Sequence, residues 1–214
     1  MIFSDRIDAG RRLAERMLHL VGSDAIVLGL PRGGVPVGYE VAVALDLPLD
    51  VIVVRKLGVP WHEELAMGAI GEGVRVLDDD TVASLQLSTD DVDAVEQREQ
   101  VELARRARRF RGQRGPLQLV GRTAIIVDDG VATGATARAA CQVAREAGAA
   151  RIILAVPVAP PDWNPPPGTV ADEFICVARP SPFFAIGQWY GDFTQTTDTT
   201  VLDLLARSAE RFRP

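Results

Sequence analysis

Two adjacent carboxylates, Asp128 and Asp129, follow a run of four apolar residues and precede a loop of small residues. The apolar run has the length of a buried parallel strand, and open α/β sheets bind ligands beyond the carboxyl ends of their strands. Gly134 lets the backbone approach an anion, while Thr133 and Thr136 offer hydroxyl donors. A helix N-terminus after the loop suits a phosphate. The stretch therefore predicts a phosphate on the loop, with the carboxylates facing sugar hydroxyls, a metal ion or developing positive charge.

A second loop suited to anions follows another short apolar run. The motif Arg32-Gly33-Gly34 lies between that run and an expected helix, where an arginine in a glycine loop is typical of an anion clamp. A tight turn with a solvated arginine is the alternative interpretation. Arg55 and Lys56 are adjacent cations at the end of the next apolar run. Two phosphate-type loops in one sheet favour the clamp.

Apolar runs and helical periodicity predict the elements that position these loops. Strands are expected over residues 25–30, 49–54, 66–70, 74–77, 124–127, 151–158 and 174–178. Helices are expected over residues 5–22, 35–45, 88–111 and 134–147, with a final helix after residue 197. The alternation of strands and helices predicts an α/β fold, a mostly parallel sheet with helices on both faces.

The chain is expected to form a single domain over residues 1–214. Its parts are a core of about residues 20–180, an inserted helical segment of about 79–112, and a C-terminal flap and helix of about 180–210. Residues 57–65 mix glycine, proline and charge, which predicts a mobile loop that can close over a site. The proline-rich residues 159–168 predict a stiff loop at the ligand edge.

The long polar helix expected over residues 88–111 is strongly basic in its second half. Its arginines, with one beyond the helix, are Arg105, Arg106, Arg108, Arg109, Arg111 and Arg114. They suit the negative end of the helix dipole and solvated ion pairs, whereas binding to RNA or another polyanion is the alternative. The helix is also suited to a subunit contact in a homodimer.

Aromatic residues gather near the C-terminus. They are Phe183, Phe184, Trp189, Tyr190 and Phe193. A planar heterocycle could stack on them, and a small satellite core beneath the flap is the equally favoured alternative.

The composition excludes some classes of protein. Of 214 residues, 47% are hydrophobic and 24% charged, with a net charge of −6, which argues against general nucleic-acid binding. Cys141 and Cys176 lack metal or redox spacing and are interpreted as buried free thiols in a reducing compartment. No apolar run is long enough to span a bilayer, so a cytoplasmic location without membrane contact is expected.

Several catalytic motifs are missing from the sequence. The loop after Asp129 has no GK[ST], no GxGxxG follows a strand, and no GxSxG occurs. The two histidines and two cysteines are too sparse for a zinc site. Walker-type, dinucleotide-binding and serine-hydrolase chemistry are therefore unsupported.

Residues 125–136, Ile-Ile-Val-Asp-Asp-Gly-Val-Ala-Thr-Gly-Ala-Thr, resemble the phosphoribosyl-pyrophosphate signature of type I phosphoribosyltransferases. Pro31-Arg32-Gly33-Gly34 is similar in position to the pyrophosphate loop of that family, and residues 55–65 to the start of its flexible catalytic loop. The C-terminal residues 189–193 resemble those of a group of bacterial predicted phosphoribosyltransferases of undefined substrate.

The resemblance implies transfer of a phosphoribosyl group from 5-phosphoribosyl 1-pyrophosphate to an unidentified acceptor, a nitrogenous base, with release of pyrophosphate. It implies a donor site with Mg²⁺ bound by Asp128 and Asp129, directly or through water. The implied catalytic residues are Asp128, Asp129, Arg32 and Lys56. The donor is expected to contact Arg32, Gly33, Gly34, Arg55, Lys56, Asp128, Asp129, Gly130, Val131, Ala132, Thr133, Gly134, Ala135 and Thr136.

The acceptor side is less defined. In members of the family that act on 6-oxopurines, an aspartate occupies the position of Ala132, so this loop is more similar to that of adenine-type enzymes. Candidates for acceptor contacts or acid–base work are His62, Glu63, Glu64, Phe183, Phe184 and Trp189. The family often has a non-proline cis peptide in its pyrophosphate loop, which places one at Arg32–Gly33.

Two other functions remain open. A regulatory paralogue would bind phosphoribosyl pyrophosphate or a nucleotide as a signal and take RNA or protein as its partner. A phosphatase or nucleotide hydrolase with an acidic Mg²⁺ site would leave Arg32-Gly33-Gly34 without a role.

Overall fold

Five parallel strands form the central sheet of the computed structural model, which describes residues 2–112, 117–165 and 171–212. The strand order is β2-β1-β6-β7-β8. These strands are β1 (Ala25–Gly29), β2 (Leu49–Val51), β6 (Thr123–Val127), β7 (Arg151–Val158) and β8 (Glu173–Ala178). Gly29 pairs with Val127, and Val127 pairs with Ala155, so the two loops with phosphate-type sequences leave the sheet side by side.

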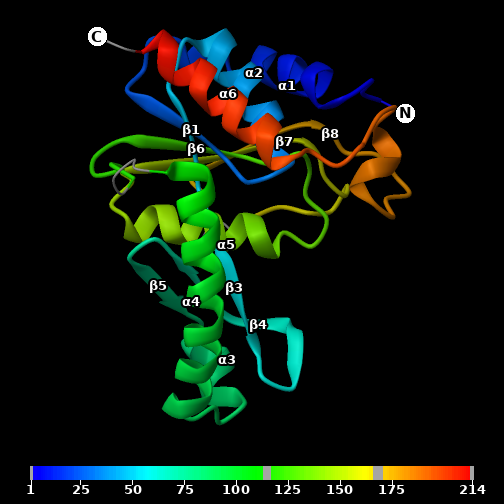
Figure 1. Ribbon diagram of the computed structural model, residues 1–214. Coiled ribbons are helices and arrows are strands. Elements are labelled where there is room, and N and C mark those ends of the chain that lie inside the picture. Colours follow the sequence, from blue (N-terminus) through cyan, green and yellow to red (C-terminus); the bar gives the residue numbers. More distant parts are fainter. Residues whose placement is uncertain (1, 113–116, 166–170, 213–214) are drawn as a thin grey trace.

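Helices cover both faces of this sheet (Figure 1). α1 (Arg6–Glu15), α2 (Gly34–Leu45) and α6 (Asp198–Arg211) lie on one face, and α5 (Ala135–Glu146) lies on the other. Adjacent strand residues therefore enter different cores: Ile125 packs in the first, Ile126 in the second. Burial on both faces explains why these strands are continuous apolar runs.

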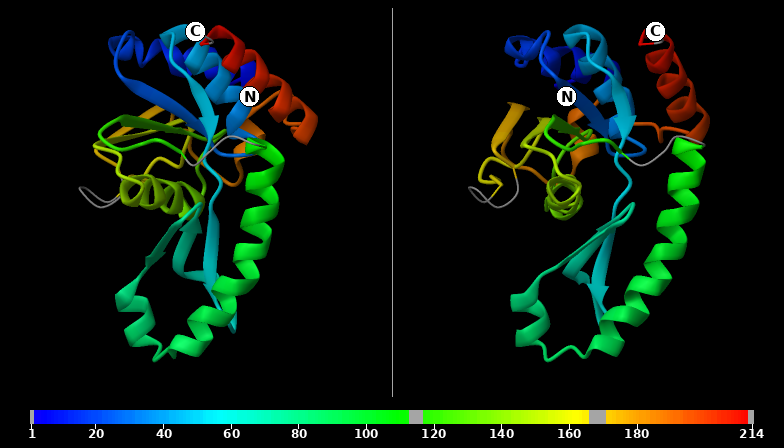
Figure 2. Two further views of the ribbon diagram at one scale, coloured as in Figure 1. Left: turned by 60° about the vertical axis from the view of Figure 1, so that its left-hand side comes forward. Right: turned by 90° about the vertical axis from the view of Figure 1, so that its left-hand side faces the viewer.

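A second, antiparallel sheet extends away from the central one. Its strands, in order, are β3 (Arg55–Val59), β4 (His62–Gly71) and β5 (Val74–Leu77). The short helix α3 (Asp79–Ser84) follows, and the long helix α4 (Thr89–Arg111) returns alongside this sheet toward α6 (Figure 2). A capping box between Ser88 and Asp91 begins α4, as the serine and acidic residues predict.

Arg111 anchors the end of α4 between the two sheets. Its guanidinium lies 3.1 Å from an oxygen of Asp50 in β2 and 3.0 Å from an oxygen of Glu72 in the β4–β5 turn. The Arg111 side chain is only 3% exposed. Burial raises the pKa of Glu72, and the nearby guanidinium opposes that rise. The ion pairs join the inserted segment to the central sheet.

The fold class and the long inserted helix are confirmed, but residues 57–65, which were expected to form a loop, are mostly strand, so the expected secondary structure is wrong there. Most of that segment is paired strand, and Val59 faces His62 across a tight turn. The pairing register shifts on both sides of Gly58, where a Cβ would lie 2.5 Å from the carbonyl oxygen of Glu63. The irregularity hides the strand alternation in the sequence.

Smaller differences concern the ends of elements. The helix expected over residues 5–22 ends at Glu15, and a separate 3₁₀ turn, η1 (Leu18–Leu20), follows it. The strand expected over 49–54 ends at Val51. Cys141 is buried and Cys176 partly buried, both as free thiols. Arg114 and part of the proline-rich segment over 159–168 lie outside the described residues.

Within the described parts of the chain, no helix is both long enough and apolar enough to cross a membrane.

The anchoring role of Arg111 predicts a large stability effect. Replacing it with alanine leaves Asp50 and Glu72 without their guanidinium in a buried setting, which is expected to lower the free energy of unfolding by about 3–5 kcal/mol. Arg108, exposed on the same helix, is the control, and its replacement with alanine is expected to change stability by less than about 0.5 kcal/mol. Urea unfolding measures both, and equal effects would refute the anchor.

Candidate functional site

The glycine loop and the acidic pair lie in direct contact at the ends of β1 and β6. The N–H of Leu30 donates to the Val127 carbonyl at 2.8 Å. A Cβ on Gly33 would lie 2.0 Å from Oδ2 of Asp129, and one on Gly34 would lie 2.4 Å from the Val127 carbonyl oxygen. Only glycine permits this approach. The structure thus brings the two predicted loops together.

The cis peptide of the glycine loop lies one bond earlier than expected. It joins Pro31 to Arg32, whereas the resemblance placed it at Arg32–Gly33. The Arg32 side chain extends toward α6, and its Nη1 lies 3.7 Å from Oδ1 of Asp198. The glycine backbone therefore faces the acidic pair while the arginine side chain faces a different element.

The small-residue loop forms a cavity of about 170 Å³ before α5. It is lined by Asp128, Ile186 and residues 130–137. Gly134 has φ +80°, and a Cβ there would lie 2.4 Å from the indole ring of Trp163. The indole N–H of Trp163 also donates to the Thr133 carbonyl at 3.2 Å. Trp163 thus supports the loop, a role that no pattern around it in the sequence indicates.

A larger cavity of about 400 Å³ adjoins the first, because Thr136 lines both. Arg55 and Lys56 lie in it as the sequence predicts, together with Glu63. Pro31 contributes from the glycine loop, and α4 contributes residues that the sequence analysis did not place there: Arg98, Glu99 and Arg106. A helix distant in sequence thus forms one wall of the cavity.

Arg55 and His62 each form hydrogen bonds with other residues in this structure. Arg55 donates to one oxygen of Glu99 from Nε at 2.8 Å and from Nη2 at 2.6 Å. His62 is exposed, and its Nδ1 accepts a hydrogen bond from the Leu65 backbone at 3.2 Å. His62 does not line the large cavity, whereas Glu63 does; the side chain of Glu64 lies outside the described part of the structure.

Asp129 forms an ion pair that the sequence analysis missed. Nε and Nη2 of Arg6 lie 2.9 Å and 2.8 Å from its Oδ2. The same guanidinium lies 4.0 Å from the ring centroid of Phe193, and the hydroxyl of Tyr190 donates to the Asp129 carbonyl. Since 123 positions separate Arg6 from Asp129, no local spacing could reveal the pair. Asp129 is tied to both the N-terminal helix and the C-terminal flap.

The two carboxylates differ in environment. Burial, and then the charge of Asp129, raise the pKa of Asp128 well above its usual range. Burial also raises the pKa of Asp129, but Arg6 opposes the rise. Ionising Asp128 is therefore costly, and a nearby cation would offset that cost.

The acidic pair fits one mode of magnesium binding. Among the described residues, no group of three or more His, Cys, Asp or Glu side chains could hold a metal ion. Mg²⁺, however, is often bound by one or two carboxylates together with substrate phosphates and water. Oδ1 of Asp128 accepts the Asp129 N–H at 2.9 Å, and Oδ2 of Asp129 is occupied by Arg6. The carboxylate oxygens suit the ion, with Asp128 as the better placed ligand.

The aromatic residues of the C-terminal segment mostly form a satellite core. Tyr190 packs on Phe3 with centroids 5.4 Å apart, and Phe183 lies 6.2 Å from Trp189. Phe184 is different, because it is 82% exposed. The short turn η2 (Ile186–Trp189) brings Ile186 against the phosphate-type loop, where a Cβ on Gly130 would lie 2.6 Å from it. The flap therefore borders the smaller cavity.

Comparisons with known proteins identify relatives of this chain. A family model described as "Phosphoribosyl transferase domain" matches residues 4–187. The Mycobacterium tuberculosis protein "Putative phosphoribosyl transferase Rv0571c" is 57% identical over 212 residues, which are 99% of this chain and 48% of that protein. The chain thus spans about half the length of the curated relatives it matches.

A solved structure shows the same fold. The crystal structure of TT1426 from Thermus thermophilus superposes with a TM-score of 0.84 at 38% sequence identity. The match covers 97% of this chain and 99% of that one.

The raised pKa of Asp128 predicts that this residue destabilises the metal-free protein at neutral pH. Because the pKa of Asp128 is higher in the folded state than its unfolded value, 3.8, ionising this residue costs folding free energy above pH 3.8. Well below that pH the carboxyl is protonated in both states, so the cost disappears. Asp128→Asn is therefore expected to raise the thermal midpoint at neutral pH, with the gain disappearing below pH 3.8.

Thermal unfolding in a chelator at both pH values tests this expectation. Asp203→Asn is the control, because the Asp203 side chain is 64% exposed. A lower midpoint for Asp128→Asn at neutral pH would contradict the interpretation.

The Arg6–Asp129 pair predicts a second effect. Both side chains are about one-tenth exposed, at 11% and 12%, so Arg6→Gln is expected to lower the free energy of unfolding by about 3 kcal/mol. Adding Asp129→Asn should recover part of the loss, because it removes the unpaired charge. Arg12→Gln, which breaks an exposed pair on the same helix, should cost less than about 1 kcal/mol. A double variant no more stable than Arg6→Gln would argue against the charge explanation.

Proposed function

The chain belongs to the phosphoribosyltransferase family, and we propose that it transfers the phosphoribosyl group of 5-phosphoribosyl 1-pyrophosphate to a nitrogenous base. The observation that supports this proposal is the contact between the glycine loop and the acidic pair, beside two adjoining cavities, the larger lined by Pro31 and the smaller by Asp128. A donor with phosphate groups at two ends and a ribose between them matches that order of sites.

The donor would be held mainly by loop backbone and hydroxyl groups. The 5-phosphate would occupy the smaller cavity, where α5 begins and Thr133 and Thr136 add donors. The ribose hydroxyls would lie beside Asp128, and the pyrophosphate would lie along Gly33 and Gly34 toward the larger cavity. Bound Mg²⁺ would neutralise charge on the pyrophosphate as it leaves.

Cations in and near the larger cavity would stabilise the leaving pyrophosphate. Lys56 lines that cavity, and so does Arg55, which is in contact with Glu99. Arg32 would reach the leaving group by giving up its 3.7 Å contact with Asp198, an exchange between partly exposed groups that costs little. Loss of pyrophosphate places positive charge on the ribose ring, which the carboxylate pair favours.

The acceptor base would enter from the side of the flap. Phe184 offers an exposed ring for stacking, whereas Phe183 and Trp189 are partly buried against the satellite core. The Ala132 side chain has no acidic group that could act on the acceptor base. Among the acid–base candidates, Glu63 lines the larger cavity with Lys56 and would face the leaving pyrophosphate, whereas His62 does not line that cavity.

A non-catalytic regulator that binds the donor or a nucleotide is the second candidate. The observation that favours it is the Arg6–Asp129 pair, since it commits one of the two carboxylates to a protein cation. A binding protein needs only to hold the ligand, whereas an enzyme must also stabilise charge on the ribose.

Pyrophosphate release from the donor, screened over a panel of bases with Mg²⁺, tests the proposal. Asp128→Asn with Asp129→Asn is expected to lower the turnover by about 100-fold or more, because it removes charge opposite the developing cation. Asp203→Asn, exposed on α6, should retain full turnover. Calorimetry with the donor completes the experiment: binding without turnover on any base would favour the regulator and refute the enzyme.

A further inference from the structure

Four arginines surround a polar cavity that lies next to the larger cavity of the proposed donor site. Arg105, Arg106 and Arg109 come from α4, and Arg32 comes from the glycine loop. Asp198, at the start of α6, also lines the cavity. The cavity has a volume of about 360 Å³, and we call it the arginine cavity.

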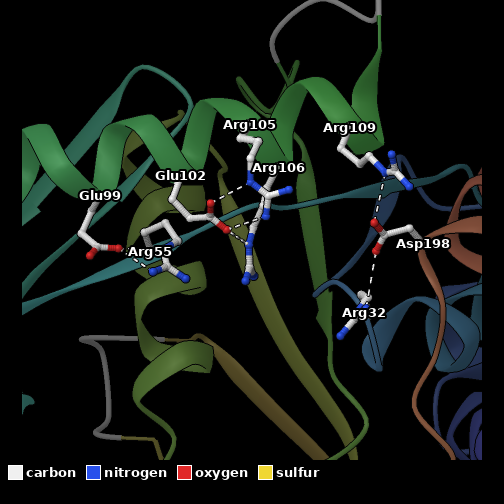
Figure 3. A network of polar contacts seen from close by, with 8 residues as sticks. All are labelled: Arg32, Arg55, Glu99, Glu102, Arg105, Arg106, Arg109 and Asp198. Carbon is white, nitrogen blue, oxygen red and sulfur yellow. Dashed lines mark hydrogen bonds and ion pairs between the residues drawn. The ribbon is translucent and has the colours of Figure 1, made fainter.

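Positive charge exceeds negative charge around the arginine cavity (Figure 3). Glu102 pairs with Arg105 and Arg106, each at 2.8 Å. Asp198 accepts contacts from Arg109 at 3.0 Å and from Arg32 at 3.7 Å. Among the described residues of this network, four guanidinium groups thus share two carboxylates. Two positive charges remain uncompensated at a concave surface.

Protein stability does not explain this cluster. The arginine side chains are 39% to 65% exposed, and ion pairs that water reaches contribute little to stability. The dipole of α4 accounts for a cation in the last turn, such as Arg109, but not for Arg32, which lies on another element. Stability alone therefore gives no reason for four guanidinium groups at one concave surface.

We propose that the arginine cavity binds a polyphosphate group. The planar guanidinium matches phosphate oxygens in a bidentate manner, and two elements direct such groups into one cavity. The volume falls within the usual range of small-ligand sites, about 300–1,000 Å³. The ligand phosphates would replace the carboxylates of Glu102 and Asp198 as partners of the arginines.

The arginine cavity neighbours the larger cavity of the proposed donor site, because Pro31 and Arg106 line both. Arg32 belongs to the glycine loop, so a ligand that holds Arg32 would keep it from the donor pyrophosphate. The bound polyphosphate would thereby oppose donor binding. This consequence rests on the proposed function, whereas the binding itself does not.

Inorganic tripolyphosphate is the probe for the binding experiment. Calorimetry in a Lys56→Gln background weakens phosphate binding in the donor cavity and leaves the arginine cavity intact. Arg105→Gln with Arg109→Gln is expected to weaken tripolyphosphate binding by about tenfold or more, because two charge-assisted contacts are lost. Asp198→Asn should instead tighten it, since one competing carboxylate is removed. Arg108→Gln, on the same helix but outside this cavity, is the matched control.

The outcomes separate the possible ligands. If a nucleoside triphosphate binds more tightly than tripolyphosphate, the ligand is a nucleotide. If the two bind with equal affinity, the cavity recognises the phosphate chain alone. The proposal is overturned if the double variant binds like its parent, or if a single-stranded RNA binds through Arg105 and Arg109 while tripolyphosphate does not bind. Absence of phosphoribosyl transfer would leave the binding result unaffected, so the two proposals fail independently.

Discussion

The close approach of two loops at neighbouring strand ends is the constraint on which the site depends. Gly33 and Gly34 occupy space in which any Cβ would collide with Asp129 or with the β6 backbone. The parallel pairing of β1 and β6 brings the loops to the same edge of the sheet, and the missing side chains let them touch. Two adjoining cavities lie beside these loops, one lined by Asp128 and the other by Pro31. The sheet geometry therefore supports the proposed site for a ligand with charge at both ends.

The first helix and the C-terminal flap both contact Asp129. Arg6 pairs with its carboxylate, Tyr190 donates to its carbonyl, and Phe193 packs against the Arg6 guanidinium. Burial and its negative neighbour make Asp128 costly to ionise, and Arg6 reduces that cost at Asp129. The acidic pair is thus two unlike groups, one stabilised by the protein and the other suited to an external cation.

The inserted segment forms one wall of the candidate site. Arg111 joins the end of α4 to both sheets through its ion pairs with Asp50 and Glu72. These pairs hold the helix beside the glycine loop. From there α4 contributes Arg106 and Glu99 to the larger cavity and most of the cations of the arginine cavity. One helix therefore supplies charged groups to two neighbouring cavities, and its anchor at Arg111 holds both sets in place.

The sequence alone determined the elements and the loop chemistry. Buried parallel strands are apolar on both faces, and helix caps have local signals, so β7 and α4 were predicted nearly to the residue. The acidic pair, the glycine loop and the cations after it were identified because each is a contiguous motif. The tertiary structure alone decided the Arg6–Asp129 pair, the support from Trp163, the paired strands over 55–65 and the grouping of four arginines. The Arg6–Asp129 pair, the Trp163 contact and the approach of Arg32 to the α4 arginines join residues far apart in the chain, and they depend on packing that no local pattern records. The hairpin over 55–65 is local, but its irregular register hides the strand alternation.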